Sequence, residues 1–199
     1  MRRLLYVFLT LLCIIGCTET KPTAGSSSMF ADDDSQPSDS TLYGLCGDGS
    51  NDHCLVLVTG LDDTLSVVIH DEESVDPTIV AGGLMAGDRI AVTACKQNEE
   101  LVAQRVINLT SLQGKWESID RGVELTEDGA VNTLDGRENP RHWTSWRILN
   151  GQLLLSRDTF DVVAIDVDTM LVEDKVGLYS YLRIRQDTTH AAYSKRRHH

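Results

Sequence analysis

The sequence predicts an all-β protein with two small antiparallel β-barrel domains. Short β-rich segments recur over residues 41–186, and turn signals made of Gly, Asp and Asn separate them. In several of these segments apolar residues occupy every second position, which is the period of a strand with one buried face. Nothing between the two ends of the chain has the apolar period of a helix. With 199 residues, 41% of them hydrophobic, the chain is large enough for two small folded domains.

The first barrel is expected over residues 41–108. In the expected strand over residues 64–70, Leu65, Val67 and Ile69 share one face, so this strand is half-buried. Five strands with a looser crossover over residues 71–87 are typical of a small Greek-key barrel of the OB kind. The expected strands span residues 42–46, 54–60, 64–70, 89–95 and 101–109.

The second barrel is expected over residues 109–186. Asn150-Gly151 is the strongest short hairpin signal in the chain and predicts a positive φ at both residues. Eight short strands joined by tight turns predict an up-and-down meander that can close on itself. The first of them begins at Leu112 to Trp116, and the others span residues 123–126, 130–133, 143–149, 152–156, 159–167, 170–172 and 178–185.

The passage from the first barrel to the second is expected to be a short apolar hinge. Leu109 and Leu112 flank Thr110-Ser111, and no Gly/Ser-rich run divides the two halves. We therefore expect the two barrels to touch and Trp116 to be buried inside the second one.

Composition and charge narrow the classes of partner. The formal net charge is -12, and nucleic-acid binding relies on clustered Lys and Arg, so no nucleic-acid partner is expected. Residues 41–108 hold 11 acidic and 3 basic residues, whereas residues 109–186 hold 13 and 9, so the first half is the more acidic. After residue 16 no apolar run approaches the length of a membrane-spanning helix.

The first sixteen residues have the pattern of a signal peptide. Arg2 and Arg3 precede a short apolar stretch that ends in Ile14-Ile15-Gly16-Cys17. This ending resembles a bacterial lipobox, which implies that cleavage precedes Cys17 and that its thiol is diacylated with palmitate-type chains. Thr18 follows the cysteine, so the resemblance favours the outer membrane. Residues 17–40 are then a lipidated, flexible tether, and the polar and basic residues 187–199 are a flexible tail.

The second half resembles the lipocalin-like domains of small bacterial lipoproteins. Gly114-Lys115-Trp116 matches the Gly-x-Trp signature that opens such a meander, and the segments GVELTEDGAV, WRILNGQLLLS and YLRIR follow it. The first half resembles the N-terminal OB-like module that these lipoproteins carry, through GDGSNDHCLVLVTGLDDTLSV and GGLMAGDRIAV. The resemblance implies a lipoprotein with an OB-like and a lipocalin-like barrel. The part after Leu112 is shorter than a ligand-carrying lipocalin, so the resemblance does not extend to an internal ligand cavity.

The thiols of Cys46 and Cys54 flank the loop over residues 47–53, and three interpretations stay open. If the loop closes a hairpin, the two residues face each other on paired strands and form a disulfide. A metal site is the second interpretation, and two buried free thiols are the third. The ligands of the metal site would be Cys46, Asp48, Asp52, His53 and Cys54. Cys95 is expected to pack as a small apolar side chain.

Arg141, His142 and Trp143 form a possible binding patch on a barrel rim. Trp143 and Trp146 are three residues apart, so in one strand they point to opposite faces, and one of them can be exposed. The sequence has no standard nucleophile, phosphate-binding or metalloprotease motif. Paired carboxylates such as Asp62-Asp63 fall in expected turns. No catalytic residue, metal ion or cofactor is therefore predicted.

These observations predict a membrane-anchored envelope lipoprotein that is a non-enzymatic binding or interaction module. Its partners would be the membrane, through the N-terminal lipid, and an envelope protein or small ligand that the sequence does not identify. Two alternatives stay open: a metal- or redox-handling lipoprotein that uses Cys46 and Cys54, and an enzyme that acts on envelope glycan.

Overall fold

The structure is a computed structural model that describes residues 39–60, 63–119, 121–137 and 141–185. The expected signal peptide, the lipidation site at Cys17, most of the tether and the tail lie outside these residues. The described residues all belong to one compact unit. In the part of the chain that the structure describes, no helix is long and apolar enough to cross a membrane.

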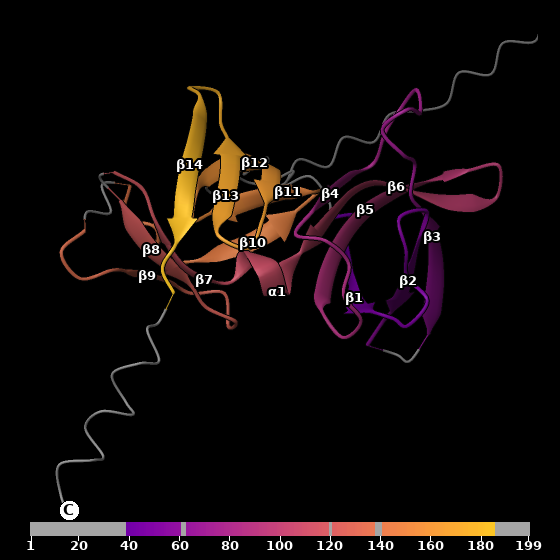
Figure 1. Ribbon diagram of the computed structural model, residues 1–199, viewed down its shortest axis with the longest axis horizontal. Helices are drawn as coiled ribbons and strands as arrows, with labels where there is room; N and C mark the ends of the chain where they lie inside the picture. Colours follow the sequence, from indigo (N-terminus) through magenta and orange to yellow (C-terminus); the bar gives the residue numbers. More distant parts are fainter. Residues whose placement is uncertain (1–38, 61–62, 120, 138–140, 186–199) are drawn as a thin grey trace, which may run out of the picture. The chain divides into compact units, whose positions relative to one another are not determined.

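The prediction of an all-β fold with two small antiparallel β-barrels is confirmed. Figure 1 shows the two sets of strands in different colours, with the single helical turn α1 (Leu109–Leu112) where the chain passes from one to the other. The first set is β1 (Leu42–Cys46), β2 (Cys54–Val58), β3 (Thr64–Val68), β4 (Ile79–Ala81), β5 (Arg89–Gln97) and β6 (Glu100–Asn108). The second set is β7 (Gly114–Glu117), β8 (Gly122–Leu125), β9 (Val131–Thr133), β10 (Trp146–Leu149), β11 (Gln152–Leu155), β12 (Asp158–Ile165), β13 (Thr169–Glu173) and β14 (Leu178–Arg183).

The first sheet closes on itself through five strands. Its order is β3-β2-β1-β5-β6, and β6 also pairs in parallel with β3, where Val68 lies opposite Val102. This is the strand order of a Greek-key barrel of the OB kind. Alternate residues of β2 fill the interior, so Leu55 and Leu57 are both fully buried.

The strand β4 was not expected. It lies inside the segment interpreted as a crossover, and it pairs in parallel with β6, where Val80 lies opposite Val106. Three residues are too short to show a period of two, and the partner strand is distant in sequence, so local sequence carries no signal for it.

The second sheet is a meander of eight strands in which consecutive strands pair, except β9 and β10, which are its two edges. Its order is β10-β11-β12-β13-β14-β7-β8-β9, so β14 pairs back onto β7. The gap between β9 and β10 is narrowed by contacts with the residues just before β10. Ala130 pairs with Ser145, and Val131 N–H donates to the Thr144 carbonyl at 3.0 Å. The barrel is therefore nearly closed, and its interior is filled by buried side chains that include Trp116, Leu153 and Phe160.

One end of the second barrel is closed by Trp116 and Arg183. Trp116 is fully buried, as expected, and its indole N–H donates to the Leu112 carbonyl at 2.8 Å. The Arg183 guanidinium lies 4.0 Å from the centroid of the Trp116 ring and donates to the carbonyls of Gln113, Ser111 and Val167. A Cβ on Gly114 would lie 2.7 Å from Arg183 Nη1, so the glycine of Gly-x-Trp leaves room for this arginine. Burial lowers the pKa of Arg183.

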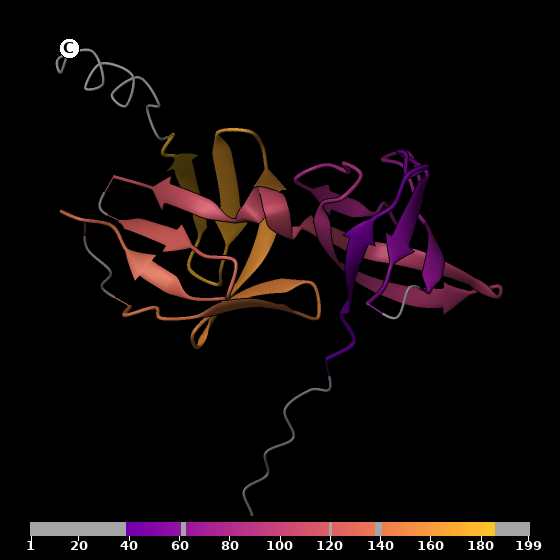
Figure 2. The same ribbon diagram turned by 90° about the horizontal axis from the view of Figure 1, so that it is seen from below.

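The hinge between the sheets is the helical turn α1 rather than extended chain. The side chain of Asn108 caps it by accepting from Ser111 N–H at 2.9 Å, and its amide donates to Asp88 Oδ2 at 2.6 Å. Leu109 and Leu112 are both buried, in agreement with the expected apolar hinge. In Figure 2 the turn leads from β6 into β7 without an intervening linker.

The two barrels touch, as expected. In β5, Ile90 and Val92 face the first barrel's interior, while Ala91 between them is buried against the core of the second barrel. Asn150 and Gly151 have φ values of +50° and +77°, which confirms the predicted hairpin turn. Thr93 Oγ1 lies 3.0 Å from where a Cβ on Gly151 would be, so this turn packs on the first barrel. The limits of the two domains stay a prediction.

Candidate functional site

The expected patch of Arg141, His142 and Trp143 lies in the loop before β10. This loop runs to Ser145, because β10 begins only at Trp146. His142 has a φ of +52°, and the loop folds back so that Trp143 and Trp146 are 3% and 8% exposed. The prediction that one of these two residues is exposed is wrong. It assumed that both belong to one strand, and the loop removes that alternation.

Trp143 begins a row of aromatic side chains that fills this end of the second barrel. Its ring meets Phe160 edge to face at 5.7 Å between centroids, and Phe160 meets Tyr179 in the same way at 6.1 Å. The Arg141 guanidinium lies over both Phe160 and Tyr179, at 5.7 and 5.9 Å from their centroids. Arg121, from the turn between β7 and β8, lies over Tyr179 at 5.5 Å. Arginines thus cap the aromatic row.

Two carboxylates hold Arg141 from either side. Arg141 Nη1 donates to Asp174 Oδ2 at 3.1 Å and lies 3.6 Å from Asp158 Oδ2. Burial lowers the pKa of Arg141, but the hydrogen bond to Asp174 and the charges of Asp158 and Asp174 outweigh it, so the net direction is upward. Arg141 is therefore fixed in position and stays protonated.

Both Asp174 and Asp158 accept hydrogen bonds from the protein. Asp174 accepts from the backbone N–H groups of Val176 and Gly177, at 2.8 and 3.1 Å, and from the side chains of Arg141 and Tyr179. Burial raises the pKa of Asp174, but these donors outweigh it, and the pKa is lowered. Asp158 accepts from the Trp143 indole N–H at 2.7 Å. Asp174 thus uses both of its oxygens inside the site, and Asp158 uses Oδ2.

The surface above this network is hollowed, and we call it the rim hollow. It consists of two adjoining depressions that share Arg141, Arg157 and Asp158. One depression, of about 530 Å³, adds His142, Trp143, Thr144 and Ser156. The other, of about 440 Å³, adds Thr159, Asp174, Lys175 and Val176.

Three residues of the rim hollow lie in turns that were not predicted to meet at one end of the barrel. Arg157 lies in the turn between β11 and β12, whereas Asp174 and Lys175 lie in the turn between β13 and β14. In an up-and-down meander, alternate turns meet at the same end of the barrel. That rule, applied to the predicted strands, would have placed these turns together.

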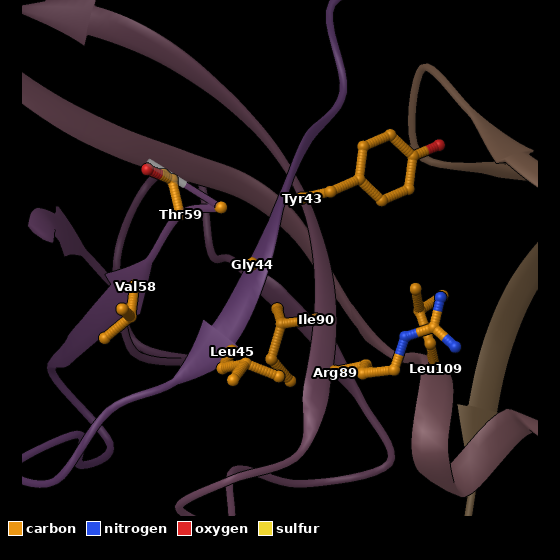
Figure 3. A pocket seen from close by; sticks show the side chains of 9 residues that line it. Tyr43, Gly44, Leu45, Val58, Thr59, Arg89, Ile90 and Leu109 are labelled. Atoms are coloured by element: carbon orange, nitrogen blue, oxygen red, sulfur yellow. The ribbon is translucent and has the colours of Figure 1, made fainter. Parts of the chain in front are cut away.

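A second hollow, of about 420 Å³, lies on the outside of the first barrel beside β1. Figure 3 shows Tyr43 and Leu45 on this strand, with Val58 and Thr59 on one side of it and Arg89 on the other. Tyr43 and Leu45 are 44% and 46% exposed. The Tyr43 hydroxyl donates to the Ile148 carbonyl of the second barrel, and Arg89 pairs with Glu127 at 3.1 Å. Its polar groups are thus already engaged, and it offers mainly apolar contact.

The structure does not pair Cys46 with Cys54. Both thiols are free, and the hairpin register places Cys46 opposite Leu57 while Cys54 lies opposite Val68 of β3. The assumption that the two cysteines face each other on paired strands is therefore wrong. Cys46 is buried, and Cys54 Sγ instead lies 3.3 Å from Ser66 Oγ. Cys95 is also a free thiol and is half-buried.

The metal interpretation of this loop finds no support in the described ranges. Within residues 39–60, 63–119, 121–137 and 141–185, no three His, Cys, Asp or Glu side chains gather closely enough to hold a metal ion. The loop's candidate ligands Cys46, Asp48, Asp52, His53 and Cys54 are all among these residues.

Comparison with known proteins gives no match: no family model fits the chain, and no curated protein or solved structure is significantly similar to it. The class that fold and site define is thus an all-β protein of two small barrels with a charged hollow at one barrel end.

Proposed function

We propose that the chain is a lipid-anchored lipoprotein of the bacterial envelope, with an outer-membrane address, and that it is a non-enzymatic binding module. The observation that carries the binding part is the rim hollow, where Arg141 is held by two carboxylates and two aromatic rings on a barrel end. Charged groups fixed in this way lose little conformational freedom when a ligand binds.

The protonation of the site favours binding over hydrolysis of a glycan. A glycosidase needs one carboxylic acid whose pKa is raised, so that it can donate a proton to the leaving group. In the rim hollow the pKa of Asp174 is lowered, and Asp158 accepts from Trp143 and faces the Arg141 charge. Both acids lie beside Arg141, and Asp174, with its lowered pKa, is a poor proton donor.

The anchoring part of the proposal rests on the sequence Ile14-Ile15-Gly16-Cys17 behind a short apolar stretch. A thioether-linked diacylglycerol on Cys17 would bind membranes stably, because two or more acyl chains are needed for stable anchoring. The ligand of the rim hollow would then be a small molecule or a protein of the envelope.

The anchoring is tested by expressing the full chain in a bacterial host with labelled palmitate, followed by fractionation of the envelope. We expect label in the protein and its recovery with the outer membrane. Cys17→Ala should abolish the label and release the protein, whereas Cys13→Ala, a matched change inside the apolar stretch, should leave both unchanged. Wild-type protein without label, or a Cys17→Ala variant that keeps it, would refute the anchor.

A further inference from the structure

We infer that the rim hollow binds a small anion, a carboxylate or a phosphate, through Arg157 and Lys175 beside the fixed Arg141. This inference rests on the proposed function of a binding module and names the chemical class of its ligand. Three cationic side chains line the hollow against two carboxylates, in a chain whose formal net charge is -12.

Asp174 does not compete for a ligand's place, because both of its carboxylate oxygens already accept from the protein. Asp174, whose side chain is 10% exposed, accepts from Val176 and Gly177 N–H as well as from Arg141. Asp158, whose side chain is 38% exposed, accepts from the buried Trp143 indole through Oδ2, and the same oxygen lies 3.6 Å from Arg141 Nη1. Both carboxylates therefore lie beside the Arg141 charge on the inner side of the hollow.

The cations on the outer side are available. Arg157 and Lys175 are both exposed, and within the described part of the chain neither has a hydrogen bond or an ion pair. An anion that binds them breaks no existing pair, so it gains charge-assisted hydrogen bonds without first losing others. Arg141, 29% exposed, adds a fixed positive charge at the boundary of the two depressions.

The chemistry of these donors selects carboxylates and phosphates. A guanidinium presents paired N–H groups that match two oxygens of a carboxylate or a phosphate, and an ammonium adds a mobile point charge. The hydroxyls of Thr144, Ser156 and Thr159 also line the hollow, so a ligand that carries hydroxyl groups finds further partners.

The size of the hollow and the charge of the chain limit the ligand to small anions. Each depression measures about 440 to 530 Å³, which suits a molecule of the size of a sugar. A large polyanion would meet the repulsion of the acidic chain as well as the attraction of the rim.

The test is calorimetric titration of the full chain in a non-ionic detergent with three probes: glucuronate, glucose 6-phosphate and glucose. We expect saturable binding of at least one anion, with glucose weaker by about tenfold or more, since charged hydrogen bonds carry the affinity. The double variant Arg157→Gln/Lys175→Gln should lose at least about tenfold in affinity for the anion. The matched control is Lys96→Gln, an exposed cation of β5, which should bind as the wild type does.

The two anionic probes decide between a carboxylate and a phosphate as the preferred group. Equal binding of glucose, no saturable binding of either anion, or an affinity that the double variant leaves unchanged would each overturn the inference. Because Arg157 and Lys175 are exposed, the double variant should melt as the wild type does, which separates lost binding from lost folding. Failure here would leave the lipid labelling of Cys17 intact, so the two proposals fail separately.

Discussion

The two ends of the second barrel both place an arginine on aromatic rings, but they use it differently. At the closed end, Arg183 lies over Trp116 and donates to three backbone carbonyls. At the other end, Arg141 lies over Phe160 and Tyr179 and is held by two carboxylates. The same residue type therefore serves to close a core at one end and to organise a charged surface at the other.

The comparison indicates that the partners of a half-buried arginine show its role better than its degree of burial does. Backbone carbonyls are present in any sequence, so they can accept from an arginine at any position where the chain brings them close. Carboxylates must be supplied by particular residues: Asp158 is the first residue of β12, and Asp174 lies in the turn between β13 and β14. The closed end should therefore govern stability, and the rim should govern binding.

The largest effect is expected at the closed end, for Trp116→Ala. The side chain is fully buried, and removal of a buried Trp costs about 3–5 kcal/mol of unfolding free energy. Chemical denaturation of the wild type and the variant measures this difference. A loss below about 1 kcal/mol, the size of an ordinary surface change, would contradict the role given to this end.

A smaller loss is expected for Gly151→Val in the hairpin turn that packs on the first barrel. The residue has a φ of +77°, which a β-branched side chain adopts only at a cost of about 1–3 kcal/mol. Its Cβ would also lie 3.0 Å from Thr93 Oγ1. Gly136→Val is the matched control, since Gly136 has a φ of +73° with open space around it. A thermal melt in which both variants lose equally would show that contact with the first barrel contributes nothing.

The smallest effect, and the one confined to the rim, is expected for Asp174→Asn. Since the pKa of Asp174 is lowered in the folded protein, its stabilising contribution is present above the unfolded value of 3.8 and is lost as the pH falls through the folded pKa. The variant should therefore melt below the wild type at pH 7, and the two curves should converge in acid below pH 3.8.

Asp168→Asn is the control for this pH series. Asp168 pairs with Arg185 at the closed end, where the two side chains are 53% and 67% exposed, so solvent screens the pair and the melting temperature should barely change. A gap between Asp174→Asn and the wild type that persists in acid would assign the effect to packing rather than to charge.

The strands could be predicted because their signals are local. Alternation located β3, and the Asn-Gly pair located the hairpin between β10 and β11. The burial of Trp116 followed from its place at the start of the meander. Each of these features depends on residues within one or two turns of the chain.

The features that the sequence did not predict depend on contacts between distant segments. Ala91 lies on the face of β5 that alternation assigns to solvent, and it is buried only because the second barrel packs there. Trp143 is buried by the conformation of its loop. The loop between β1 and β2 keeps Cys46 and Cys54 from facing each other. Cys46 lies opposite Leu57, and Cys54 pairs with Asn51 inside the loop.

The candidate site was predicted in part. Arg141, His142 and Trp143 were placed on a rim because they are adjacent in sequence, and the structure does bring them to the same hollow. The acids and the outer cations come from the start of β12 and from two turns further along the chain, so their convergence is a property of the nearly closed meander.

The first described residues are hydrogen-bonded to a turn that is synthesised much later. Ser40 N–H and its hydroxyl donate to Asn150 Oδ1, 110 residues further on, and Asn150 N–H donates to the Thr41 hydroxyl. All strands of the first barrel are present once the ribosome has passed Asn108. These hydrogen bonds, in contrast, can form only after the β10–β11 hairpin has emerged from the ribosome. The first barrel can therefore fold first and provide the surface on which the second barrel completes these contacts.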